Sequence, residues 1–145
     1  MFANGAGRQI IEEYVNKGKV RFGYWNYGFL GDESLWAAEA SECAADQDKF
    51  WEYHDLLFSK QSGENQGAFS KENLKKFATE LKLDVKEFNE CLDSGKHTEE
   101  IKQNSYVASE IGVRSTPSFL INGQPVIGAQ AFEEFKKIIE QLLTN

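Results

Sequence analysis

The stretch GVRSTPSFLINGQPVIGAQAFEEF, residues 112–135, decides the fold. Within it, two short apolar runs at 118–121 and 124–127 flank the dipeptide Asn122-Gly123. Asparagine and glycine tolerate the positive φ angles that a two-residue hairpin turn requires at its central positions. The segment therefore predicts a β-hairpin, and this is the strongest local signal in the chain.

Regular apolar spacing predicts one further strand and two terminal helices. Over residues 132–143, apolar side chains recur every three or four positions, which is typical of one face of a helix. Residues 19–26 alternate between apolar and polar side chains, which predicts a strand. An apolar stripe at residues 10–15 predicts a helix in front of that strand, and Gly18 is well placed to end it.

The middle of the chain has the periodicity of helices. The predicted helices cover residues 32–59 with a break near 46–48, then 70–81, 84–95 and 98–111. Short polar side chains that can cap a helix stand at the start of the first three, namely Asp32, Ser70 and Asp84. This run of helices lies between the predicted strand and the predicted hairpin.

The order of elements is helix, strand, a run of helices, hairpin and helix, which indicates an α/β fold. No glycine-rich phosphate loop supports a dinucleotide-binding arrangement. The order matches the second half of a thioredoxin fold with helices inserted. We therefore expect a single domain over residues 1–145, with a helical insertion at 32–111 and the hairpin and last helix at 112–145.

Composition excludes several classes of partner. The formal net charge of −7 argues against nucleic acid or an anionic membrane surface as a partner. No apolar run approaches the length of a membrane span. The first residues, MFANGAGRQIIEEY, lack the basic-then-apolar pattern of a signal peptide, so we expect none in this chain.

The chain has two cysteines, Cys43 and Cys91, and two histidines, His54 and His97. The cysteines do not form a Cys-x-x-Cys pair, and the four residues have no metal-ligand spacing, so no metal site is predicted. We expect His54 to pack within its helix and His97 to be exposed. No motif indicates a cofactor, and we expect none.

Four segments resemble the DsbA-like family of thiol:disulfide oxidoreductases: residues 18–22, 33–58, 83–97 and 112–135. The resemblance implies a thioredoxin-like fold with an inserted helical subdomain. It also implies an extracytoplasmic protein, in the periplasm or at the cell exterior, that passes disulfides to folding proteins. In that family a Cys-x-x-Cys motif at a helix N-terminus carries the chemistry, because the helix end lowers the pKa of the thiol.

The same resemblance assigns a substrate-binding role to two residues and places the family's catalytic cysteines outside this chain. Thr116 and Pro117 match the family's cis-proline loop, where the substrate backbone pairs. The family's Cys-x-x-Cys motif would fall before Phe2, and the strand that precedes the motif would fall there too. We therefore expect an N-terminally truncated chain with a partial fold, no catalytic residue and no oxidoreductase activity as given.

Three interpretations of Cys43 and Cys91 stay open: two buried reduced thiols, a redox pair, or a structural disulfide between inserted helices. An exported family and an even number of cysteines favour the structural disulfide. Their Cα atoms should then lie within roughly 7 Å of each other. Closing a loop of about 48 residues would stabilise the fold by ~4 kcal/mol in the chain-entropy model.

Two other functions remain as alternatives: a non-catalytic peptide-binding or chaperone module, and, more distantly, a glutathione-dependent isomerase. In the family's sheet, the strand before the Cys-x-x-Cys motif lies between the strands that correspond to residues 19–26 and 118–121. A sheet without it exposes unpaired backbone groups, which proteins avoid. The gap could be filled by a strand from a second copy, by the N-terminal residues folding back, or by direct closure of the two flanking strands. We favour the second copy and therefore expect a homodimer.

Overall fold

The computed structural model describes residues 2–144, which form two compact units. One unit consists of the residues up to Tyr24 together with those from Ile111 onward, and the other runs from Trp25 to Glu110. The division expected from the sequence, at 32–111 and 112–145, remains a prediction about domain organisation.

The predicted hairpin is confirmed. Strand β1, Ser118–Ile121, pairs antiparallel with β2, Gln124–Ile127, so that Phe119 lies opposite Val126. Asn122 and Gly123 turn between the strands with φ angles of 47° and 85°, as a two-residue turn requires. Within the part of the chain that the structure describes, these two strands form the whole sheet.

The hairpin packs against the last helix, α7, Phe132–Leu143. The rings of Phe119 and Phe135 meet edge to face, with centroids 5.0 Å apart. Helix α1, Ala6–Ile10, runs on into a π-helical turn, η1, Ile11–Val15, and α1 packs against α7. The buried core of this unit is Ile10, Tyr14, Val126, Phe135 and Ile139.

The strand predicted for residues 19–26 is wrong, because this segment is extended but pairs with no strand among residues 2–144. Its first two amides turn back to the preceding helix instead. The N–H groups of Lys19 and Val20 both donate to the carbonyl oxygen of Tyr14, at 2.9 and 3.3 Å. Alternating side chains fix which residues face inward, but a strand also needs a partner for its hydrogen bonds.

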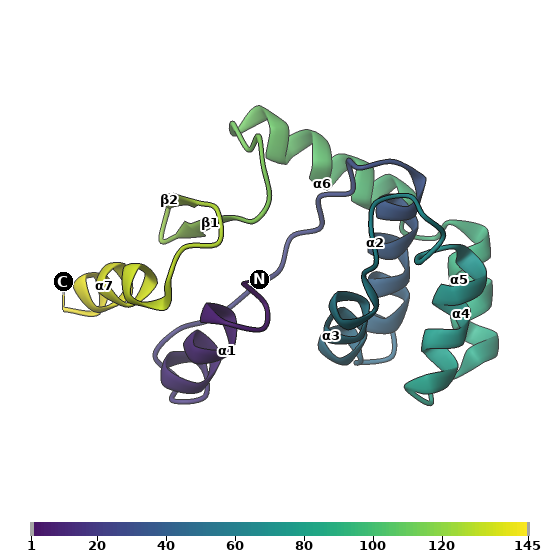
Figure 1. Ribbon diagram of the computed structural model, residues 1–145, viewed down its shortest axis with the longest axis horizontal. Coiled ribbons are helices and arrows are strands. Elements are labelled where there is room, and N and C mark those ends of the chain that lie inside the picture. The colour runs from purple at the N-terminus through teal and green to yellow at the C-terminus, as the bar shows by residue number, and fades with distance from the viewer. Residues whose placement is uncertain (1, 145) are drawn as a thin grey trace. The chain divides into compact units, whose positions relative to one another are not determined.

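The second unit consists of five helices, shown in blue to green in Figure 1. They are α2, Asp32–Ala45; α3, Phe50–Lys60; α4, Lys71–Glu80; α5, Val85–Ser94; and α6, Thr98–Glu110. The break predicted near residues 46–48 is present, and Asp48 adopts a left-handed φ of 57° there. Helix α2 lies at the centre, because it contacts each of the other four.

Two of the three predicted caps are present. The Ser70 hydroxyl accepts a hydrogen bond from the N–H of Asn73 at 3.4 Å, and the Asp84 carboxylate accepts one from Glu87 at 3.0 Å. Gly95 ends α5 in the left-handed conformation, with φ of 64°, as its position predicts.

The third cap, expected at Asp32, is wrong. Gly31 occupies the cap position and Asp32 lies in the first turn. The capping oxygen comes instead from Asn65, far along the chain, whose side chain accepts from the N–H of Glu33 at 3.4 Å. Glu33 in turn accepts hydrogen bonds from the amides of Gly67 and Phe69, so the loop around Asn65 is bound to the start of α2.

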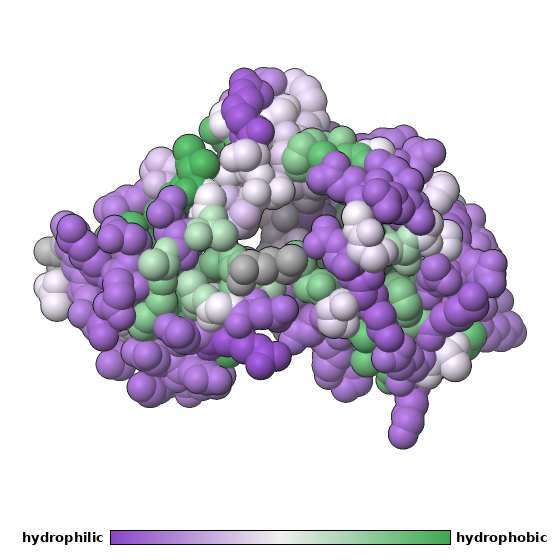
Figure 2. All heavy atoms as spheres, viewed as in Figure 1, coloured by the Kyte–Doolittle hydropathy of each residue, from purple (hydrophilic) through white to green (hydrophobic). Residues whose placement is uncertain are grey.

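Hydrophilic residues cover much of the surface seen in Figure 2, over α7 and over α4 and α5. None of the helices described is both long enough and apolar enough to cross a membrane. This agrees with the absence of a predicted span in the sequence.

Replacing Tyr14 by phenylalanine should destabilise the unit that holds the hairpin. The buried Tyr14 hydroxyl donates to the Glu140 carboxylate at 3.0 Å, joining residues 126 positions apart. Its loss should lower the free energy of unfolding by about 1 kcal/mol at pH 7, measured by urea denaturation. The matched control is Tyr106→Phe, because 59% of Tyr106 is exposed.

The advantage of Tyr14 over phenylalanine should also depend on pH. Burial, followed by the hydrogen bond to Glu140, raises the pKa of Tyr14 from 10.0 to about 12. Because the pKa is higher in the folded chain, the stabilisation is complete below the unfolded value and is lost as the pH rises through about 12. A constant difference between the two proteins from pH 9 to about pH 12 would contradict this coupling.

Candidate functional site

Cys43 and Cys91 are joined in a disulfide between α2 and α5. Their Cα atoms are 5.9 Å apart, within the distance predicted for a bridge, and the residues are 48 positions apart in sequence. The interpretation of two free reduced thiols is therefore wrong. The bond lies in the core of the helical unit, with 1% of Cys43 and 8% of Cys91 exposed.

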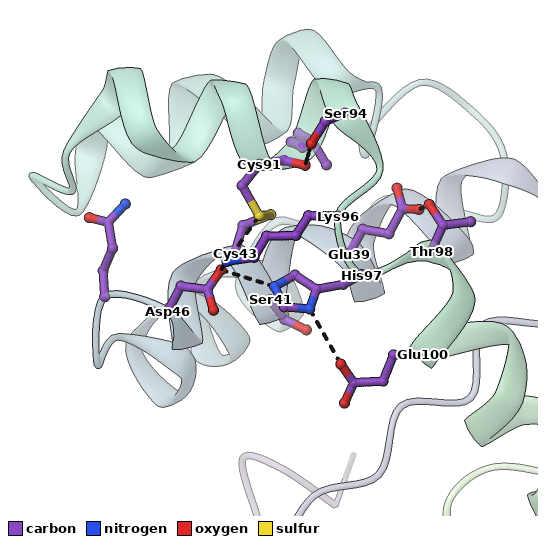
Figure 3. The surroundings of a disulfide bond; sticks show 12 residues. Glu39, Ser41, Cys43, Asp46, Cys91, Ser94, Lys96, His97, Thr98 and Glu100 are labelled. Carbon is purple, nitrogen blue, oxygen red and sulfur yellow. Dashed lines mark hydrogen bonds and ion pairs between the residues drawn. A yellow bond between two sulfur atoms is a disulfide. The ribbon is translucent and has the colours of Figure 1, made fainter.

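Asp46 connects the disulfide to two basic side chains (Figure 3). Its Oδ2 atom lies 3.7 Å from Cys91 Sγ, 2.8 Å from Lys96 Nζ and 2.9 Å from His97 Nε2. Burial raises the pKa of Asp46, but the hydrogen bonds from Lys96 and His97 outweigh it and leave the pKa below its ordinary value. The carboxylate is therefore ionised at neutral pH.

His97 is held at both ring nitrogens, and the prediction that it is exposed is wrong. Nε2 faces Asp46, while Nδ1 lies 3.3 Å from Glu100 Oε2 (Figure 3). Only 14% of the side chain is exposed to solvent. The turn between α5 and α6 brings His97 back over the end of α2, which the spacing of residues in the sequence does not show.

The disulfide forms part of the wall of an open pocket of about 250 Å³. Cys43, Asp46, Cys91 and Lys96 all contribute to that wall. The disulfide therefore borders this pocket, although only 1% of Cys43 and 8% of Cys91 are exposed. The Sγ atoms of Cys43 and Cys91 and a ring nitrogen of His97 all lie within 4.8 Å of one another.

The other predicted site, Thr116-Pro117, lies in the unit that holds the hairpin. Its peptide bond is cis, as the family resemblance implied. Two hydrogen bonds fix the loop: the N–H of Gly128 donates to the Pro117 carbonyl at 2.8 Å, and the Ser118 hydroxyl donates to the Ser115 carbonyl at 2.6 Å. Thr116 itself is exposed.

His54, the second histidine, belongs to neither site. It packs on α3 against the ring of Phe58, with centroids 4.7 Å apart, and its Nδ1 lies 3.0 Å from Asp55. This agrees with the expectation of a packed helix residue.

Comparison with known proteins agrees with this arrangement of hairpin, loop and helices. The family model described as Thioredoxin matches residues 1–141. The chain belongs to the thioredoxin family, in its DsbA-like branch. The predicted α/β thioredoxin-like fold with added helices is thereby confirmed.

Named relatives support the DsbA-like branch. The chain is 32% identical over 139 residues to "Probable disulfide bond formation protein D" of Bacillus anthracis, covering 93% of this chain and 63% of that protein. It superposes on the oxidised crystal structure of BdbD from Bacillus subtilis with a TM-score of 0.90 and 26% identity, covering 99% of this chain and 80% of that one.

A third likeness concerns the fold alone. The thiol-disulfide exchange protein alpha-DsbA2 of Wolbachia pipientis matches with a TM-score of 0.76 at 24% identity, over 97% of this chain and 77% of that chain. The chain spans slightly less than two thirds of the length of the Bacillus disulfide bond formation proteins that it matches.

The expectation that this DsbA-like chain is inactive is not supported. Its one cysteine pair is present as a disulfide, the chemical group through which thiol–disulfide exchange proceeds. The structural role expected for Cys43 and Cys91 remains a prediction, as does the binding of substrate at Thr116 and Pro117.

The disulfide should make a large contribution to stability. In the chain-entropy model, closing a loop of 48 residues stabilises the folded state by ~4 kcal/mol. We expect Cys43→Ala/Cys91→Ala to lower the free energy of unfolding by about that amount in urea. The reduced native chain is the control, because it loses the bond and keeps both side chains. Equal midpoints for oxidised and reduced chain would contradict the prediction.

Proposed function

We propose that this chain takes part in thiol–disulfide exchange with folding polypeptides. Its Bacillus relatives are named as disulfide bond formation proteins, which supports this chemistry. The substrate backbone binds in an extended conformation along β1, next to Thr116 and Pro117. The observation that carries this proposal is the outer edge of β1. Family membership supports the chemistry, and the edge supplies the place where a polypeptide binds.

The outer edge of β1 offers backbone groups for pairing. In an antiparallel ladder, successive residues direct their backbone groups alternately toward the partner strand and away from it. The two-residue turn makes Ile121 and Gln124 a hydrogen-bonded pair, so Ser118 and Leu120 direct theirs outward. Among residues 2–144 no strand covers this edge, and 58% of Leu120 is exposed. An extended polypeptide adds to such an edge as a further strand.

The start of β1 favours a defined register for that polypeptide. The Pro117 carbonyl accepts from Gly128 across the hairpin, so Pro117 faces the inner side and the outward-facing backbone groups of β1 begin at Ser118. The two hydrogen bonds of the loop, from Gly128 and Ser118, keep the exposed Thr116 in place beside the edge. A preformed loop loses little conformational entropy on binding, which favours affinity.

The disulfide also bears on the compartment in which the protein works. Disulfides persist in oxidising surroundings and are rare where thiols are kept reduced. The Cys43–Cys91 bond therefore supports an extracytoplasmic location for this protein.

A second candidate function is a peptide-binding or chaperone module that uses the same edge without exchange. Its support is the burial of both cysteines in the helical unit. Refolding of reduced ribonuclease separates the two functions. Oxidation of the ribonuclease by the native chain, lost in Cys43→Ser/Cys91→Ser, assigns exchange to this pair. Suppressed aggregation without oxidation, equal in both proteins, assigns the module.

The homodimer expected from the sequence would place a second copy on the same edge of β1. Light scattering after size-exclusion chromatography measures the mass directly. If the chain is a dimer and an added polypeptide dissociates it, the second copy and the polypeptide use the same edge. If the chain is a monomer, the second copy does not compete with substrate for this edge.

Polypeptide binding should depend on the surface beside Thr116. A cysteine-free unfolded polypeptide, reduced and carboxymethylated α-lactalbumin, should shift the backbone amide resonances of residues 115–121 in a ¹⁵N-labelled sample. We expect Thr116→Arg to weaken its binding about tenfold, equivalent to about 1.4 kcal/mol, because the long side chain lies where the backbone approaches.

Thr79→Arg on α4 is the matched control, since it adds the same side chain at an exposed threonine of the helical unit. Equal weakening by both variants would mean that the effect is one of charge alone. Shifts confined to residues outside 115–121 would show that the polypeptide binds elsewhere.

A further inference from the structure

We infer that reduction of the Cys43–Cys91 disulfide creates a zinc site, with Cys43, Cys91, His97 and Asp46 as ligands. The sequence indicated no metal site, because these residues come from α2, α5 and the turn before α6. Two thiolates, an imidazole and a carboxylate form a donor set of the kind that binds Zn²⁺. The inference is independent of the polypeptide edge on β1.

The ligand atoms lie close to the spacing of tetrahedral coordination, and one pair already has that spacing. Zinc bonds of about 2.3 Å to sulfur and about 2.0–2.2 Å to nitrogen and oxygen place neighbouring ligand atoms about 3.4–3.8 Å apart. Cys91 Sγ lies 3.7 Å from Asp46 Oδ2, and His97 Nε2 lies 2.9 Å from the same oxygen. The cysteine sulfurs and a ring nitrogen of His97 are mutually within 4.8 Å. The distance from Sγ to Oδ2 is that of two zinc ligands, whereas the 2.9 Å between Nε2 and Oδ2 is a hydrogen-bond distance that zinc would widen by about 0.5 Å.

Reduction of the disulfide frees both sulfurs to bind zinc. A dithiol reductant transfers two electrons and two protons to the disulfide, becoming a disulfide itself, while Cys43 and Cys91 become thiols. With their Cα atoms 5.9 Å apart, the two sulfurs can separate to ligand spacing by side-chain rotation. Zinc then binds both as thiolates, and their two protons pass to solvent.

A neighbouring carboxylate is placed to orient His97 as a zinc ligand. Histidines that bind metal commonly donate their other ring N–H to a carboxylate, which fixes the ring and its tautomer. Glu100 occupies that place, 3.3 Å from Nδ1 of His97. This geometry directs Nε2 toward Asp46 and the sulfurs (Figure 3).

Charge and access also favour the site. Two thiolates and the Asp46 carboxylate exceed the charge of Zn²⁺ by one, and Lys96, whose Nζ lies 2.8 Å from Asp46, supplies the balancing positive charge. The open pocket lined by Cys43, Asp46 and Cys91 is the side from which a reductant and the ion would approach the cluster.

Cobalt and zinc titrations of the full chain test the inference. The chain is reduced with a phosphine, which adds no competing sulfur ligand, and is titrated with Co²⁺ and then with Zn²⁺. We expect one equivalent of Co²⁺ to give thiolate charge-transfer bands and the visible bands of a tetrahedral ion, which Zn²⁺ abolishes. The oxidised chain should give neither band.

Variants assign the ligands by competition with a chromophoric chelator. His97→Asn should lower zinc affinity by at least about 100-fold, and Glu100→Gln by about tenfold, because loss of an outer partner alone costs about 10- to 100-fold. The controls are His54→Asn, the other histidine, and Glu90→Gln, a carboxylate of the pocket wall, and both should bind zinc like the native chain.

Three results would overturn the inference: no charge-transfer band in the reduced chain, the same bands in the oxidised chain, or unchanged affinity in His97→Asn. If the reduced chain without metal loses its helical circular dichroism, Zn²⁺ should restore that signal in the native chain and not in His97→Asn. Failure to restore it, or equal restoration in both, would also overturn the inference.

Discussion

Close packing against α2 is the constraint on which the helical unit depends. Most of the buried side chains of α2 are small, among them Ala38, Ala40, Cys43 and Ala44. Small residues let neighbouring helices approach closely, and α3, α4, α5 and α6 each contact α2. The Tyr53 ring fills the space beside these side chains, and its hydroxyl donates to the Leu74 carbonyl at 2.8 Å, so that a large buried side chain leaves no polar group unpaired.

The cysteine cluster is a consequence of that packing. Because α5 crosses close to α2, Cys91 reaches Cys43, and the turn that follows α5 carries Lys96 and His97 to Asp46 at the end of α2. The same arrangement explains why two chemical states are open to the cluster. As a disulfide it ties two helices together, and as a pair of thiols it stands beside an imidazole and a carboxylate.

The hairpin unit depends on a different kind of contact. Phe119 from β1 packs on Phe135 from α7, so the inward face of the hairpin is covered while the outer edge of β1 is left with no strand among the described residues. The side chains and the outward backbone groups of β1 therefore have different roles. Its side chains hold the core, and its outward backbone groups at Ser118 and Leu120 remain for a polypeptide that adds to the sheet.

By itself, the sequence determined the features that residues close in the chain create together. These are the hairpin at Asn122-Gly123, the caps at Ser70 and Asp84, and the helical periods between them. Only the tertiary structure decided which distant residues meet. Asn65, and not Asp32, caps α2, and the segment 19–26 pairs with no strand among the described residues. His97 lies against Asp46, 51 positions away. The physical reason is range, because a cap or a turn acts over three or four residues, whereas a ligand cluster requires helices already packed in one geometry.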